Sequence, residues 1–253
     1  MKQKNLDREA KESPASTGGG GCQKGSPFYT RQWLDQYCNI FNMKIINNCG
    51  GRLFGVPGKG LASSGFAQEQ IEAGAIGEQN LAKLMILAGM MNYATTFWSM
   101  SIPDTKYDTD VDCIVLSGDD TIYLIDAKLY KTHPGTHYES NGFDKLWLKN
   151  DMDGSIIKTY EPSRNMLMAA DKYSKRFPEY KVVPIMALCP NVSGSPAVAP
   201  GTALFFREFY GYESMPVMSA VDLVPALANQ VKRVPYTDRQ LGMVCELKRY
   251  VKW

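Results

Sequence analysis

One segment of the chain constrains the fold more than any other: Asp-Val-Asp-Cys-Ile-Val-Leu-Ser-Gly-Asp-Asp-Thr-Ile-Tyr-Leu-Ile-Asp-Ala-Lys, residues 110–128. It contains two runs rich in β-branched and aromatic residues, 112–116 and 121–128. Such runs favour β-strands, and the Ser-Gly-Asp-Asp stretch between them is typical of a turn. The segment therefore predicts a β-hairpin.

The ends of this hairpin carry charged side chains. Because side chains alternate between the two faces of a strand, Asp126 and Lys128 share one face, and pairing brings Asp112 alongside Asp126. Two carboxylates at such a short distance repel each other, and a bound cation is the simplest compensation. Oxygen ligands suit Mg²⁺ or Mn²⁺. The alternative is that Asp126 and Lys128 form only a surface ion pair.

Helices and strands alternate around the hairpin. The patterns predict helices at 66–89, 163–176, 220–231 and 238–251, further strands at 181–188 and 203–206, and a long polar loop at 130–154. The first helix contains Glu78 together with Gly74 and Gly77. Glycine lowers helix propensity, which suggests that another backbone approaches closely beside Glu78. The order of elements predicts an α/β fold.

The N-terminal region is expected to lie outside this core. Residues 1–27 are small and polar and predict a disordered tail, and residues 28–65 predict a helix followed by a glycine-rich loop. The Gly58-Lys59-Gly60 step invites comparison with a phosphate-binding loop. The required Ser or Thr after the lysine is missing, as is the earlier glycine, so a plain loop is the better interpretation.

The charge balance sets limits on nucleic-acid binding. The net charge of the 253 residues is only +2, so any affinity for nucleic acid must come from a local basic surface. Lys145, Lys149 and Lys158 surround Trp147 and Tyr160, a basic and aromatic combination that can follow a nucleic-acid backbone. The alternative is an ordinary solvated loop.

Cysteine spacing and hydropathy exclude other classes of protein. The six cysteines form no CxxC pair, which excludes a zinc ribbon and a thioredoxin-like motif and leads us to expect free thiols. No apolar run reaches the roughly 20 residues of a membrane helix, and the first residues lack the apolar stretch of a signal peptide. We expect a cytoplasmic protein with no membrane partner.

The helix and hairpin motifs together resemble a known family. Gly77-Glu78 on a helix, then residues 111–116, a turn and residues 122–128, are similar to the nuclease-related domain (NERD), a branch of the PD-(D/E)XK nuclease superfamily. The resemblance covers residues 70–206. It implies a restriction-endonuclease-like core with a central mixed β-sheet flanked by helices, placed at 66–210 and followed by a C-terminal helical extension at 211–253.

The resemblance also implies a function and a set of site residues. Asp112 would be the hairpin carboxylate, Asp126 and Lys128 the acid-x-lysine pair, and Glu78 the helical acid, with Mg²⁺ or Mn²⁺ held by the three carboxylates. The implied activity is metal-dependent hydrolysis of DNA phosphodiester bonds. The alternative is a catalytically inactive DNA-binding or protein-interaction domain of the same fold, and homo-oligomer formation is left open. The chain departs from the family in having Asp126 where Glu is usual and Cys113 where His is usual.

Overall fold

The computed structural model describes residues 52–59, 67–106, 109–130, 134–141, 145–161, 163–189, 203–209, 212–235 and 237–252. The tail expected at 1–27 and the helix expected after it lie outside the described residues. Of the glycine-rich loop, only residues 52–59 are described.

A seven-stranded mixed sheet forms the centre of the molecule, with strand order β1-β2-β3-β4-β8-β10-β9. The strands are β1 (Leu53–Phe54), β2 (Thr95–Ser101), β3 (Asp110–Leu116), β4 (Thr121–Lys128), β8 (Lys181–Leu188), β9 (Ala203–Phe209) and β10 (Tyr212–Ser219). Strands β2, β3 and β4 form an antiparallel meander. Strand β8 runs parallel to both β4 and β10, whereas β9 is antiparallel to β10. The predicted hairpin is therefore confirmed and lies inside the sheet.

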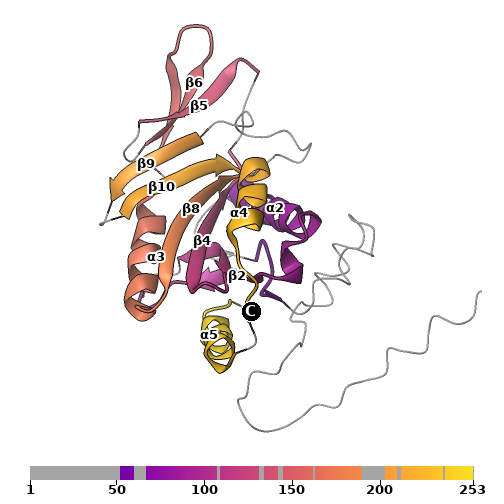
Figure 1. The fold of residues 1–253 in the computed structure, drawn as a ribbon. Helices are drawn as coiled ribbons and strands as arrows, with labels where there is room; N and C mark the ends of the chain where they lie inside the picture. Colours follow the sequence, from indigo (N-terminus) through magenta and orange to yellow (C-terminus); the bar gives the residue numbers. More distant parts are fainter. Residues whose placement is uncertain are drawn as a thin grey trace, which may run out of the picture.

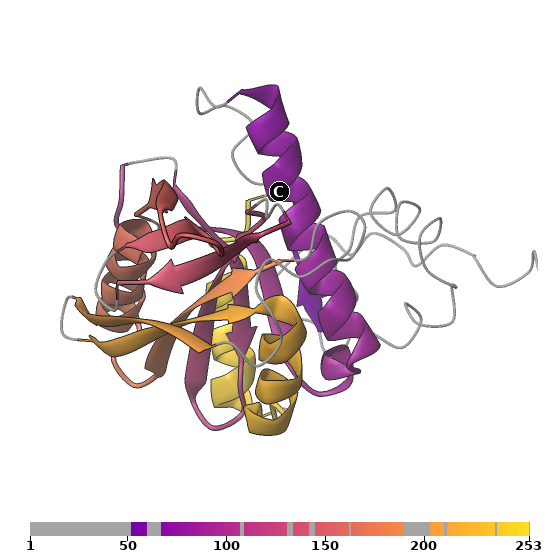
Figure 2. The ribbon, with the colours of Figure 1, turned by 90° about the horizontal axis from the view of Figure 1, so that it is seen from above.

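Helices cover both faces of this sheet (Figures 1 and 2). They are α2 (Gln68–Leu87), the short 3-10 helix η2 (Met90–Asn92), α3 (Ser163–Arg176), α4 (Ala220–Gln230) and α5 (Asp238–Lys248). Strand β4 shows how alternation divides the core. Ile122 and Leu124 pack in the apolar cluster that includes α3 and α5, whereas Tyr123 and Ile125 pack in the cluster that includes α2 and α4. The expected α/β class, with a central mixed sheet flanked by helices, is confirmed.

A second, three-stranded sheet is inserted between β4 and α3. Its strands are β5 (Thr136–Ser140), β6 (Leu146–Asn150) and β7 (Ile156–Tyr160), paired antiparallel in that order. Figure 1 shows β5 and β6 projecting beyond the β9 and β10 side of the main sheet. The prediction of a polar loop at 130–154 is therefore wrong. Tyr138, Leu146 and Leu148 are buried and supply the apolar face that holds the insertion to the body.

Three strands of the main sheet, β1, β2 and β10, were not predicted. Residues 211–253, expected as a helical extension, contribute β10 as well as α4 and α5. Strand β10 lies between β8 and β9, so this segment is an integral part of the sheet.

Two further expectations concern membranes and thiols. None of the helices in the described part of the chain is long and apolar enough to cross a membrane. Cys113 and Cys189 are buried free thiols, as expected. Cys245 is disulfide-bonded, so the expectation of free thiols is wrong at that position.

Candidate functional site

The β3–β4 hairpin brings Asp112 to the end of β4. At the open end of the hairpin Cys113 pairs with Ile125, and the same register continued by one residue sets Asp112 opposite Asp126. The Asp112 carboxylate is anchored there, because its Oδ2 accepts a hydrogen bond of 2.7 Å from the backbone N–H of Ala127. Two carboxylate-bearing positions from different strands thus meet at one end of the hairpin.

Asp126 and Lys128 form a direct ion pair on this end of β4. Lys128 Nζ donates to Asp126 Oδ1 at 2.6 Å, and the two side chains are 32% and 11% exposed, respectively. The pair is therefore partly buried, with Asp126 less exposed than Lys128. A partly buried pair is weak evidence for stability, because desolvation offsets much of the attraction.

Glu78 reaches the same region from helix α2. A Cβ atom added at Gly77 would lie 3.3 Å from Leu129 Cβ and 3.5 Å from Leu129 N, so α2 passes close to the chain that leaves β4. The inferred close approach is thus confirmed for Gly77, whereas nothing lies within 4 Å of such an atom at Gly74. Glu78 is only 5% exposed, and its Oε2 accepts a hydrogen bond of 2.8 Å from Gly58 N.

Burial and mutual repulsion govern the ionisation of these carboxylates. Burial raises the pKa of Glu78 to about 8; Asp110 and Asp126 add to this effect, and the Gly58 N–H and Lys128 oppose it. Burial likewise raises the pKa of Asp112 well above its usual range, with Glu78 and Asp126 contributing and Lys128 opposing.

Lys128 responds in the opposite way. Burial by itself would lower the pKa of its ammonium group, but the Asp126 and Asp112 carboxylates outweigh that effect and hold the pKa above its ordinary value. Lys128 therefore stays protonated across the physiological range. Glu78, Asp112, Asp126 and Lys128 form one electrostatically coupled group, called here the acidic site.

The acidic site fits a hard divalent cation by the chemistry of its donors, which are all carboxylate oxygens. The described residues nevertheless contain no group of three or more His, Cys, Asp or Glu side chains placed to hold a metal ion. Mg²⁺ commonly needs only one or two protein carboxylates, with water and substrate phosphate completing its coordination. The arrangement is thus compatible with two ligands, Asp112 and Asp126, and does not form a complete cage.

Sequence reasoning missed Tyr130, which adjoins this group. Its ring stacks on Tyr160 of the inserted sheet, with centroids 4.2 Å apart and an interplanar angle of 22°. Burial raises its pKa; the Lys128 charge opposes this shift and Asp126 adds to it. Tyr130 continues the two-residue spacing of Asp126 and Lys128, so strand alternation was the signal that pointed to it.

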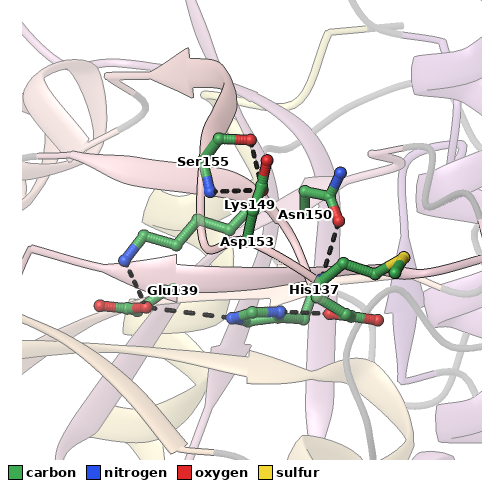
Figure 3. Close-up of polar contacts among 8 residues, drawn as sticks. His137, Glu139, Lys149, Asn150, Asp153 and Ser155 are labelled. Carbon is green, nitrogen blue, oxygen red and sulfur yellow. Dashed lines mark hydrogen bonds and ion pairs between the residues drawn. The ribbon is translucent and has the colours of Figure 1, made fainter.

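Several other charged residues lie away from this group. Asp104, part of a literal Pro-Asp pair, is exposed in the turn after β2, and its carbonyl oxygen accepts from Lys172 Nζ. In the inserted sheet, Lys149 binds Glu139 and His137 lies between Glu139 and Asp151 (Figure 3). Neither group belongs to the acidic site.

Comparison with known proteins adds no relative from which a role could be transferred. The chain matches no protein-family model, no curated protein and no solved structure.

Proposed function

We propose that the chain is a metal-dependent nuclease that hydrolyses DNA phosphodiester bonds at the acidic site. One observation carries this proposal. Three carboxylates and one lysine, from a helix and two adjacent strands, lie near a buried end of the sheet, where burial and neighbouring charges shift the pKa values of Glu78, Asp112 and Lys128. Strongly perturbed ionisation in such a cluster is typical of functional sites, because burying repelling charges costs stability.

The surrounding architecture supports a restriction-endonuclease-like core of the NERD type. Helix α2 precedes an antiparallel meander of β2, β3 and β4, and helix α3 leads on to β8, which runs parallel to β4. The four site residues fall on α2, β3 and β4, the elements on which the resemblance places them.

Each residue has a chemical role in this proposal. Asp112 and Asp126 would hold Mg²⁺ or Mn²⁺, with Glu78 close by. When bound, such an ion polarises a phosphodiester and lowers the pKa of a coordinated water. Lys128 supplies a permanent positive charge that orients the attacking water or stabilises the charge developing on phosphorus oxygens. Glu78, with its pKa of about 8, can exchange a proton near neutral pH.

A second candidate function is a catalytically inactive DNA-binding or protein-interaction domain of the same fold. It is favoured by the Asp126–Lys128 pair, in which one side chain already neutralises the other at 2.6 Å. It is also favoured by the lack of a ready three-ligand metal group among the described residues.

The test is to incubate the protein with circular and linear DNA in Mg²⁺, Mn²⁺ or EDTA. We expect wild-type cleavage with either metal and none in EDTA, and no cleavage by Asp126→Ala. Asp171→Ala is the matched control, since it removes a carboxylate that pairs with the exposed Lys175 on α3, away from the acidic site. Metal-independent DNA binding without cleavage would support the second candidate. A wild type that neither binds nor cleaves DNA would exclude both DNA-directed functions.

A further inference from the structure

A row of aromatic rings connects the inserted three-stranded sheet to Tyr130, two residues beyond Lys128 of the acidic site. Tyr130, which follows β4, stacks on Tyr160 at the end of β7 with a centroid distance of 4.2 Å. Both rings also lie 6.0 Å from the ring of Tyr138 on β5. Tyr138 is 2% exposed, so this side of the insertion is anchored in the main apolar core.

A lysine extends this row away from the site. Lys158 Nζ lies 4.8 Å from the centroid of the Tyr160 ring, a cation–π contact. Because Lys158 Nζ lies 4.8 Å from the Tyr160 centroid and that centroid lies 4.2 Å from the Tyr130 centroid, the nitrogen is within about 9 Å of the Tyr130 ring centre. Tyr130 is itself close enough to Lys128 and Asp126 to be influenced by their charges.

The three lysines predicted to surround the aromatic residues differ in their partners. Lys149 forms a 2.7 Å ion pair with Glu139, as Figure 3 shows, and Lys145 lies 3.7 Å from Glu161. Lys158 is exposed and forms no ion pair within the described part of the chain. Its charge is therefore available to a ligand.

The two faces of the inserted sheet explain this difference. Lys158 is paired with Leu148, which is buried, so it lies on the inner face that also carries Tyr160. Lys149 follows Leu148 directly and therefore points to the opposite face. The ring row and the unpaired charge share one face.

We propose that Lys158, positioned by Tyr160, binds a backbone phosphate of the nucleic-acid strand whose neighbouring phosphate occupies the acidic site. This inference rests on the proposed function. Lys158 Nζ lies within about 9 Å of the Tyr130 ring centre, a reach suited to a phosphate close to the scissile bond on the same strand. The anionic strand complements the charge of Lys158, and the insertion acts as a strand-binding arm of the site.

The experiment measures binding of a fluorescent single-stranded oligodeoxynucleotide by anisotropy in EDTA, at several salt concentrations. Lys158→Ala should weaken binding roughly five- to tenfold at 0.1 M salt and reduce the slope of log K against log salt by about 0.7. Lys149→Ala is the matched control, because it removes a lysine of the same sheet whose charge Glu139 neutralises. It should bind as the wild type does.

Variants of Tyr160 test its positioning role. Tyr160→Phe keeps the ring beneath Lys158 and should bind like the wild type. Tyr160→Leu loses the cation–π contact and should bind like Lys158→Ala, with thermal melting used to verify that each variant is folded.

The outcomes separate this inference from the proposed function. If the wild type cleaves and binds DNA while Lys158→Ala binds equally well, or is weakened no more than Lys149→Ala, the strand-binding arm is refuted and the nuclease proposal stands. If the wild type neither binds nor cleaves DNA, both are refuted.

Discussion

The ionisation of Glu78 makes the dependence of stability on pH a sharp test of the acidic site. Its pKa in the folded protein is raised from the ordinary 4.5 to about 8. Between these values the folded protein keeps a proton that the unfolded chain releases, so the unfolding free energy falls as the pH rises. The change is complete once the pH exceeds about 8.

The size of the effect follows from this interval. Each pH unit between the two pKa values corresponds to about 1.4 kcal/mol. From pH 6 to pH 9 the wild type should therefore lose on the order of 2 to 3 kcal/mol through Glu78. Glu78→Gln removes the titration while leaving an oxygen that can accept from Gly58 N. The variant should be more stable than the wild type at pH 9, and the advantage should shrink at pH 6.

Urea unfolding in EDTA at the two pH values measures the difference. With a slope of about 3 kcal/mol per molar urea, the wild-type midpoint should fall by up to about 1 M more than that of Glu78→Gln. Glu69→Gln is the control, because Glu69 is an exposed carboxylate in the first turn of the same helix. Parallel loss of stability in wild type and Glu78→Gln would refute the argument, since it would mean that Glu78 ionises freely.

The remaining predictions concern the metal, the lysine and the helix contact. Asp126→Ala should abolish Mg²⁺ and Mn²⁺ binding in calorimetry while the circular dichroism spectrum stays that of the wild type; unchanged metal affinity would place the metal elsewhere. Lys128→Ala should lower single-turnover DNA cleavage about 10²- to 10³-fold with little loss of DNA affinity, because its charge acts mainly in the transition state. The reverse pattern would make Lys128 a binding residue only. Gly74→Ala should stabilise α2 by up to about 1 kcal/mol. Gly77→Ala should not show this gain, because its added Cβ atom would lie only 3.3 Å from Leu129 Cβ. Equal midpoints for the two variants in thermal unfolding would contradict the close approach.

Local patterns were sufficient for the parts of the fold that depend on neighbouring residues. The hairpin predicted at 112–116 and 121–128 is found at Asp110–Leu116 and Thr121–Lys128. Turn residues and strand alternation act over a few positions, so they can be recognised in the sequence. The same reasoning placed Asp112, Asp126 and Lys128 at one end of the hairpin.

Strands β2 and β10 were missed because their sequences lack such patterns. In β2 the first six residues are all buried, so no alternation of polar and apolar side chains marks it as a strand. Strand β10 contains Pro216, a residue that argues against an internal strand, yet it pairs with both β8 and β9. Their positions depend on non-local pairing, which is favourable only within the complete sheet.

The sequence by itself determined which acids and which lysine belong to the hairpin, because residue type and strand period are local properties. Only the tertiary structure decided that Glu78 is buried beside them, that its pKa rises, and that Tyr160 stacks on Tyr130. Burial and the repulsion between carboxylates depend on which elements pack together. Residues far apart in the chain acquire these properties only when the sheet and helix α2 exclude water around them.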